Sequence, residues 1–404
     1  MNNSFRKIAK TVLITISASM LFMAVSSIRN NAGIIVTGIV ENTDINYEFV
    51  SFVMAVGQIF IGLTPPFFGI LAEKKGPRFT ILLGIVFTVA GLLIAPLCQT
   101  ELQLLLDYGV LLHGFLGAIS FGILTSTLAI KIPEEHQTVA IGVINATGGL
   151  GCSVTAPILA TAIAAGGLSA GLKISTIIFI GMIPVTFYLC GGRGGNKTEA
   201  KRDKELADID SVSLVKSAAK TKVFWCAALI YGFSGFHMTI ITNHITNEIM
   251  SFGYDYVEAS NIYSFYGLSA IVGAVLSGII CSRFSMEKVL RVIFISHIVI
   301  CAAYALLPKT QVILCAIVFL LGFTGVASVS PISGILQQNY GVRGLSVFYP
   351  ICYVVHQFGG FASAWLGGLC FTHFGSYALF WTIDCVFAVI AVVLSYQLKP
   401  GQSS

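Results

Sequence analysis

Twelve long apolar stretches, separated by short polar turns, restrict this 404-residue chain more than any other feature of its sequence. A helix needs about 20 mainly apolar residues to cross a lipid bilayer. The stretches cover residues 11–38, 49–72, 79–97, 102–130, 138–165, 172–190, 222–250, 256–281, 289–307, 310–336, 344–371 and 376–397. Since 56% of the residues are hydrophobic and only 10% are charged, the composition is unlike that of a soluble domain. The sequence predicts an all-α membrane protein with twelve transmembrane helices.

The basic residues lie almost entirely on one side of the predicted membrane. If the N-terminus is cytoplasmic, 20 of the 23 Lys and Arg residues fall on cytoplasmic segments, Lys173 and Lys309 are external, and Arg29 lies within a helix. Positive charge is retained on the cytoplasmic side, so we expect a multi-pass membrane protein with both termini in the cytoplasm. The first apolar stretch has no small-residue cleavage site and is too long for a signal-peptide core, so we expect it to be retained.

One long polar segment, residues 191–221, divides the apolar stretches into six and six. This division predicts an N-terminal bundle over 1–190 and a C-terminal bundle over 222–404, joined by a cytoplasmic linker. Two similar turns support an internal repeat, GILAEKKGPR at Gly69–Arg78 and GIICSRFSMEK at Gly278–Lys288. Each follows the small-residue end of a helix in the corresponding position of its half, which indicates two pseudo-symmetric bundles.

The first of these turns resembles the loop signature of the major facilitator superfamily, G-x-L-A-[DE]-[RK]-x-G-x-R. The second matches less well, because Ser282 and Ser285 replace the acidic residue and the glycine. In such a loop Gly69 would let helices approach closely and Gly76 would make the tight turn, while the charged side chains hold one conformation closed. The residues that we assign to conformational gating are Gly69, Glu73, Lys74, Gly76, Arg78 and Arg283.

Three further stretches resemble the bacterial branch of the monocarboxylate porter and oxalate/formate antiporter group within that superfamily. They are SIRNNAG in the first apolar stretch, NATGGLGCSVTAPILA at Asn145–Ala160, and YVVHQFGGFASAWLGGLCFTHFGSY at Tyr353–Tyr377. The resemblance implies a secondary-active carrier of small organic anions that works by alternating access, with proton symport or anion exchange. The chain departs from the better-known carriers of the group in stretch 256–281, which contains no arginine.

The sequence is also compatible with two other functions, an exporter and a transporter-like sensor. The segment around Asn145–Ala160 also resembles the Gly/Pro-rich antiporter motif of drug exporters, so the alternative is an exporter of drugs or other metabolites by proton antiport. Arg29 and the scarcity of carboxylates in the expected cavity argue against a cationic substrate. A transporter-like sensor would be expected to carry a docking extension, for which the short terminal segments give no indication.

Arg29 is the polar residue that points most directly to a binding site. An arginine at bilayer depth costs about 2.5–3.5 kcal/mol on insertion scales, so it should face a polar cavity or an ion-pair partner. Its planar guanidinium can hold a carboxylate through two parallel hydrogen bonds, so we predict that Arg29 binds the substrate. Two alternatives are a position near the outer interface, about 28 Å along the helix from Lys10, and a resting ion pair with Asp107.

The helix arrangement that the resemblance implies places the first, fourth, seventh and tenth helices around a central cavity, with the second, fifth, eighth and eleventh beside it. Histidines on these helices could exchange a proton between pH 5 and 8, and His356 is the leading candidate. His297 and Asp384 fall on outer helices, so we assign them a structural role. The predicted substrate-binding residues are Arg29, Gln58, His113, Asn145, His237, Tyr266, His356 and Gln357.

The sequence contains no pattern that indicates an enzyme or a cofactor site. It has no P-loop, so ATP is not expected to power the carrier. The ten cysteines lack the spacing of metal ligands or disulfides, and we interpret them as small packing residues. We expect a non-enzymatic monomer without cofactor, metal or nucleic acid, whose partners are a small carboxylate, a proton and the lipid bilayer.

Overall fold

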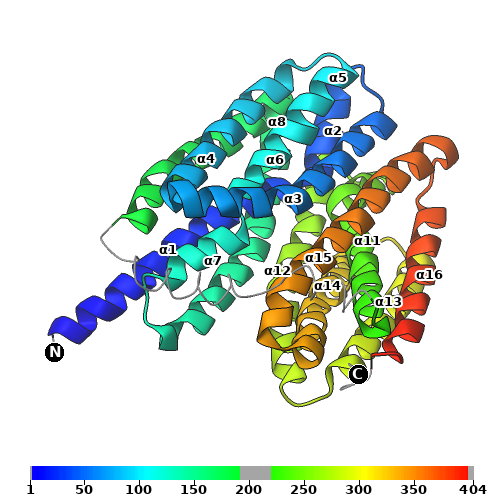
Figure 1. Cartoon of the computed structure of the whole chain (residues 1–404). Helices are drawn as coiled ribbons and strands as arrows, with labels where there is room; N and C mark the ends of the chain where they lie inside the picture. The colour runs from blue at the N-terminus through cyan, green and yellow to red at the C-terminus, as the bar shows by residue number, and fades with distance from the viewer. Residues whose placement is uncertain (1, 192–219, 399–404) are drawn as a thin grey trace.

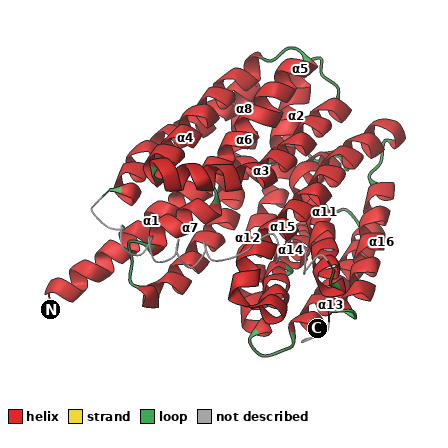
Figure 2. Ribbon diagram, in the orientation of Figure 1, coloured by secondary structure: helices red, strands yellow, loops and turns green. Residues whose placement is uncertain are grey.

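The computed structural model describes residues 2–191 and 220–398, and in these ranges the chain folds into helices without a β-strand (Figures 1 and 2). Most of the predicted linker, residues 192–219, lies outside the described residues. Ten of the described helical segments are long and apolar enough to cross a membrane. The all-α fold predicted from the sequence is therefore confirmed.

The N-terminal half contains the helices up to the end of the predicted first bundle. They are α1 (Asn2–Arg29), α2 (Ala32–Asn42), α3 (Tyr47–Lys75), α4 (Pro77–Ile94), α5 (Glu101–Leu104), α6 (His113–Leu116), α7 (Phe121–Ala129) and α8 (Glu134–Cys190). Helix α8 is two spans in one, because Gly166 and Gly167 leave the helical conformation and Gly167 has φ +70°. Glycine adopts positive φ without the steric cost that a Cβ imposes.

The C-terminal half is formed by the helices that follow residue 221. Its helices are α11 (Lys222–Ser251), α12 (Tyr256–Cys281), α13 (Met286–Leu306), α14 (Gln311–Ala327), α15 (Val329–Phe374) and α16 (Ala378–Ser395). Helix α15 contains the end of the span that begins in α14 and the whole of the next span, and the two are divided at Gly341, where φ is +69°. When α8 and α15 are divided at these glycines, the helical segments correspond to the twelve stretches predicted from hydropathy.

The first predicted stretch, 11–38, is wrong in one respect, because it is two helices and not one. Helix α1 ends at Arg29 and α2 begins at Ala32. The fourth stretch is also irregular, since it passes from α5 into a π-helix at Leu105–Leu112, then into α6 and a 3-10 turn. Short π-helical segments are frequently found at functional sites.

Three helix pairs join the halves in the described residues. Helix α3 packs along α15, α8 packs along α12, and α2 packs against α11. At the second pair the backbones touch, since a Cβ added at Gly149 would overlap the carbonyl of Gly267, and one added at Gly267 would overlap that of Gly149. Small residues allow such close approach between helices in a membrane.

The halves meet on one side of the molecule and diverge on the other. Both described ends of the chain lie on the lower side of Figure 1, where α1 and α7 lie away from α12 and α15. On the opposite side, which carries the loop of residues 43–46, the Tyr47 hydroxyl lies 2.8 Å from Nδ1 of His244 and 2.8 Å from the Tyr377 hydroxyl. The Tyr256 hydroxyl also donates to the carbonyl of Ile34 across the halves. We name these the termini side and the loop side.

Candidate functional site

The break between α1 and α2 places polar backbone groups within the first span. Asn31 is not helical, with φ −102° and ψ 24°, and its side-chain Nδ2 donates to Oγ1 of Thr155 at 2.7 Å. The carbonyl of Asn30 accepts a hydrogen bond from the Tyr263 hydroxyl of the other half. Interrupted helices of this kind are typical of substrate sites in secondary transporters, because they present unpaired backbone groups and helix ends inside the membrane. The break follows directly after Arg29.

Arg29 extends from the end of α1 toward α15. Its Nη2 atom lies 3.4 Å from Oε1 of Gln357, and its Cζ atom lies 6.0 Å from the centre of the Tyr353 ring. No carboxylate forms an ion pair with Arg29 among the described residues. The sequence-based alternative of a pair with Asp107 is not seen, because both oxygens of that carboxylate are buried without a hydrogen-bond partner. Arg29 is thus a half-buried cation without an anionic partner in the part of the chain that is described.

Two buried side chains, His356 and Gln58, hold the amide of the buried Gln357 in one orientation. His356 donates from Nδ1 to Oε1 of Gln357 at 2.9 Å, and Nε2 of Gln357 donates to the carbonyl and to Oε1 of Gln58 at 3.0 and 3.2 Å. None of the three is more than 5% exposed. The network crosses from α15 to α3 and leaves the oxygen of Gln357 directed at both His356 and Arg29.

Three tyrosines form an aromatic wall beside this network. The ring of His356 lies 4.5 Å from that of Tyr231 and 5.6 Å from that of Tyr353, measured between centres. The hydroxyls of Tyr231 and Tyr349 are 2.8 Å apart. The sequence analysis missed these tyrosines, although the spacing of positions 349, 353 and 356 places them on one face of a helix and would have identified two of them.

His113 and Tyr266 are buried and lie close to Arg29, one in each half. Nδ1 of His113 lies 2.6 Å from the carbonyl of Tyr108 within the π-helix, and its ring packs against Gly57 of α3. Tyr266 stacks on Tyr263 with ring centres 5.7 Å apart. Both are near enough to Arg29 for an electrostatic interaction.

Asn145 lies at the margin of the interface between the halves. It is exposed on α8, one helical turn before Gly149, where α8 meets α12. Residues four apart share one face of a helix. Asn145 therefore lies on the face of α8 that is turned toward the other half, on the termini side of the point where the two helices touch.

His237 does not contribute to the group around Arg29. Its Nδ1 atom lies 2.8 Å from Oδ2 of Asp384 on α16, and its Nε2 atom lies 3.1 Å from the carbonyl of Leu321 on α14. The same Asp384 oxygen is 2.8 Å from Nε2 of His297 on α13. Both ring nitrogens of His237 are thus directed at neighbouring helices of its own half and not at the site between the halves.

The predicted gating turn between α3 and α4 lies on the termini side. Gly76 has φ +88°, which favours glycine there. No atom lies within 4 Å of a Cβ added at Gly69, so the close helix approach expected there is absent, because the halves diverge on this side. Arg78 donates to the carbonyl of Cys190 at 3.3 Å. Within the described ranges, no ion pair includes Glu73, Lys74, Arg78 or Arg283.

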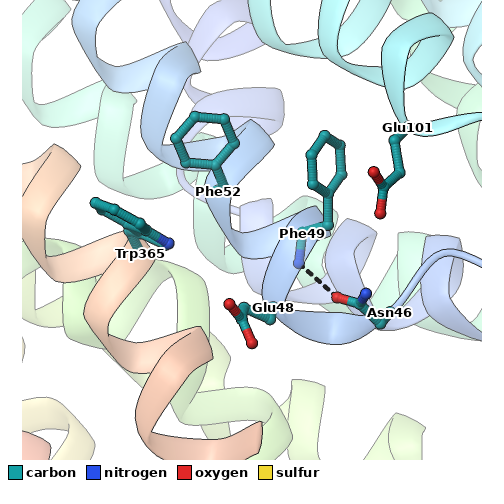
Figure 3. Close-up of a pocket in the computed structure, with 6 residues that line it drawn as sticks. All are labelled: Asn46, Glu48, Phe49, Phe52, Glu101 and Trp365. Carbon is teal, nitrogen blue, oxygen red and sulfur yellow. Dashed lines mark hydrogen bonds between the residues drawn. The ribbon is translucent and has the colours of Figure 1, made fainter.

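A hollow of about 390 Å³ lies on the loop side, away from Arg29 (Figure 3). Asn46 accepts a hydrogen bond from the backbone N–H of Phe49 there and caps the start of α3. The hollow carries two acidic side chains and none of the predicted binding residues, so we do not assign the substrate to it. Its lining residues are Asn46, Glu48, Phe49, Phe52, Glu101 and Trp365.

Residues 12–353 match the family model of the Major Facilitator Superfamily. Among solved structures, the chain is similar to the nucleoside transporter NupG, with 15% identity, a TM-score of 0.75, and coverage of 96% of this chain and 98% of that one. It is also similar to a D-xylose-proton symporter, with 12% identity, a TM-score of 0.72, and coverage of 98% and 99%. At these identities the likeness shows the fold alone. No curated protein sequence gives a significant match. The family match spans most of the chain, which therefore belongs to the major facilitator superfamily and is a multi-pass membrane transporter and not an enzyme.

Proposed function

We propose that the chain carries a small organic anion of the monocarboxylate type by alternating access, through proton symport or anion exchange, with Arg29 as the group that binds the anion. The observation that carries this proposal is the cation at the helix break, which has no anionic partner among the described residues. A guanidinium inside a membrane is retained where it pairs with a charge or faces a polar cavity. A substrate carboxylate would supply that charge and would accept two parallel hydrogen bonds from it.

The surroundings of Arg29 support a substrate that also has polar or ring atoms. His356 and Gln58 already fix the orientation of Gln357, so substrate binding loses little conformational entropy of its side chain. The wall of Tyr231, Tyr349 and Tyr353 offers hydroxyls and flat apolar faces next to the cation. The site therefore has a charged end for a carboxylate and an aromatic side for the rest of the molecule.

In the orientation predicted from the basic residues, the side on which the two halves diverge faces the cytoplasm. In that orientation the loop side, closed by Tyr47, His244 and Tyr377, faces outward, and the diverging termini side faces inward. The group around Arg29 lies at the contacts between α1, α3 and α15. Rocking of the two halves about these contacts would expose the group to each side in turn.

Reporter fusions test this orientation in the bacterial inner membrane. We expect reporters placed within residues 191–221 or after Ser404 to be cytoplasmic, and a reporter in the Glu41–Glu48 loop, which has no basic residue, to be external. Activity of a reporter that works only outside the cell, fused within the 191–221 segment, would contradict the orientation.

A second candidate is a neutral ring-bearing substrate, such as a pentose or a nucleoside. It is favoured by the three tyrosines and the two glutamines around the site, because amides and hydroxyls bind neutral hydroxyl groups and aromatic rings stack on flat ligands. The two similar structures are those of a nucleoside transporter and a xylose-proton symporter. In this case Arg29 would donate to hydroxyl or carbonyl oxygens and not to a carboxylate.

A thermal-shift screen of the purified protein decides between these substrates. The panel consists of monocarboxylates, dicarboxylates, pentoses, nucleosides, amino acids and cationic drugs. A ligand at 100 times its dissociation constant stabilises the folded state by about 2.7 kcal/mol, which is readily measured. We expect monocarboxylates to raise the melting temperature. A shift with pentoses or nucleosides alone would support the second candidate, and a shift with cationic drugs alone would support the drug-export alternative.

A further inference from the structure

Three ionisable side chains form a buried cluster inside the C-terminal half, which we name the His-Asp-His cluster. It consists of His237 on α11, His297 on α13 and Asp384 on α16, each 2% exposed or less. Oδ2 of Asp384 lies 2.8 Å from Nδ1 of His237 and 2.8 Å from Nε2 of His297. The two imidazole rings are 3.6 Å apart between centres. Sequence reasoning treated His297 and Asp384 as structural, and their joint contact with His237 changes that interpretation.

The hydrogen bonds of His237 define its protonation state. Its Nδ1 atom faces a carboxylate oxygen, and its Nε2 atom faces the carbonyl of Leu321 at 3.1 Å. The same Asp384 oxygen faces an imidazole nitrogen of each histidine, the arrangement of an ionised carboxylate that accepts from both. With Asp384 ionised, both partners of His237 can only accept, since a backbone carbonyl carries no proton either. Both nitrogens must therefore donate, and an imidazole that donates from both nitrogens is a cation.

His244, two turns further along the same helix, shows the ordinary arrangement. Its Nε2 atom faces the carbonyl of Ala364 at 2.9 Å, but its Nδ1 atom faces the hydroxyl of Tyr47, which can donate. A neutral ring satisfies both contacts. Of these two histidines, only His237 requires the additional proton.

The charge of the cluster changes with this proton. With His237 charged, Asp384 ionised and His297 neutral, the cluster has no net charge, which is the inexpensive state for a buried site. Loss of the proton leaves one uncompensated negative charge. The other titratable groups that face the cluster are the thiols of Cys301 on α13 and Cys385 on α16, while α14 contributes the Leu321 carbonyl. No Lys or Arg forms an ion pair with the cluster in the described part of the chain.

Release of the proton must alter the packing of α11. If Nε2 loses its proton, a nitrogen lone pair faces the Leu321 carbonyl, and if Nδ1 loses it, a lone pair faces Asp384. Either change replaces a hydrogen bond by repulsion inside the membrane, where an unsatisfied polar group is costly. The contact of α11 with α14 or with α16 is therefore stable only while His237 is protonated.

The same helix contacts the candidate substrate site. Tyr231 lies against the ring of His356, and a Cβ added at Gly235 would overlap the His356 carbonyl. Gly235 and His237 are two residues apart, so a shift of α11 at the cluster would be transmitted to α15, which carries His356 and Gln357. The cluster and the site are thus joined by one rigid element.

We propose that the His-Asp-His cluster binds the proton that is coupled to transport, at a place separate from the substrate. His237 takes the proton from water when the cluster is opened, and returns it to water on the side to which the carrier has turned. The inference rests on the proposed function only in that it assumes proton-driven transport. The protonation state itself is a property of the protein without substrate.

Magic-angle-spinning NMR of the full chain, labelled with 15N-histidine and embedded in lipid bilayers, tests the protonation state directly. At pH 7.5 we expect one histidine with both ring nitrogens protonated, whereas an exposed histidine is mainly neutral at this pH. The signal should disappear in His237→Gln and should become that of a neutral ring in Asp384→Asn. The exposed His136 provides the matched control, since His136→Gln should leave the signal unchanged.

Several outcomes would overturn the proposal. The first is the absence of a doubly protonated ring in the wild-type protein. The second is persistence of its signal in His237→Gln, and loss of the signal in His356→Gln would then assign it to His356. Retention of a metal ion by the cluster, detected by elemental analysis before and after EDTA treatment, would also overturn it. The wild-type spectrum decides even if a cluster variant fails to fold.

Transport measurements then distinguish proton coupling from substrate translocation itself. They use a substrate identified by the thermal-shift screen. In proteoliposomes, His297→Gln and Asp384→Asn should lose accumulation driven by a pH gradient and retain exchange of internal for external substrate. Equal loss of both activities would contradict the coupling role. If no compound is transported at all, the proposed function fails, but the NMR result still stands for the cluster.

Discussion

Replacement of Arg29 by lysine is expected to remove most of the affinity for the anionic substrate, and Arg29→Ala to remove nearly all of it. An ammonium group cannot reproduce two parallel hydrogen bonds to a carboxylate. The loss of one charge-assisted hydrogen bond costs about 1.5–3 kcal/mol, which weakens binding about 10- to 150-fold. Titration calorimetry with the anion that gives the largest thermal shift measures the effect.

The melting temperature of the same variants separates a binding role from a structural one. Removal of one member of a buried ion pair costs about 3–5 kcal/mol because it leaves the other charge uncompensated. Arg29 has no such partner among the described residues, and Gln357 keeps its bonds to His356 and Gln58. We therefore expect both variants to melt within a few degrees of the wild type. Normal anion binding by Arg29→Ala would end the proposed role of this residue.

A large side chain at Gly267 is expected to disfavour the described conformation and to stop transport. A Cβ at this position already overlaps the carbonyl of Gly149, so Gly267→Leu must push α12 away from α8. Overpacking of this kind costs about 1–3 kcal/mol, which changes a conformational equilibrium by about 5- to 150-fold. The population should move toward conformations in which these two helices are separated on the loop side.

Alkylation of the native residue Cys152 can be used to follow this movement, so that no cysteine has to be introduced. It is fully buried, and its Sγ atom lies 3.3 Å from the Tyr263 hydroxyl at the same interface. Alkylation by a membrane-impermeant maleimide, measured on the Cys152 peptide by mass spectrometry, should increase in Gly267→Leu. Gly142→Leu is the matched control, because nothing lies within 4 Å of a Cβ at Gly142 on α8. Unchanged alkylation together with normal transport in Gly267→Leu would show that α8 and α12 do not form a gate.

The membrane spans could be predicted from the sequence because the property that defines them is local. Inside a bilayer the backbone must satisfy its own hydrogen bonds, so an apolar segment of sufficient length becomes a helix whatever its neighbours are. The glycines that divide α8 and α15 are local signals too, since only their own φ angles are involved. Arg29 could be found in the same way, because a charge in an apolar stretch is unusual wherever it packs.

The helix break, the aromatic wall and the location of His237 were decided by contacts between residues far apart in the chain. Asn30 and Asn31 leave the helix where Tyr263 and Thr155 offer hydrogen bonds that replace the lost ones. Gln357 takes its orientation from Gln58, which belongs to the other half. Helical periodicity indicated one face for His237 and His244, but it could not say which helices would cover that face.

Hydropathy along the chain thus determined roughly where the membrane spans of the described residues begin and end, because burial in lipid depends on each segment alone. Only the tertiary structure decided which cation lacks an anionic partner among the described residues, which amide faces it, and which carboxylate is shared by two histidines. Each of these features is a distance between side chains from different helices, and helix packing sets such distances through the shapes of both surfaces.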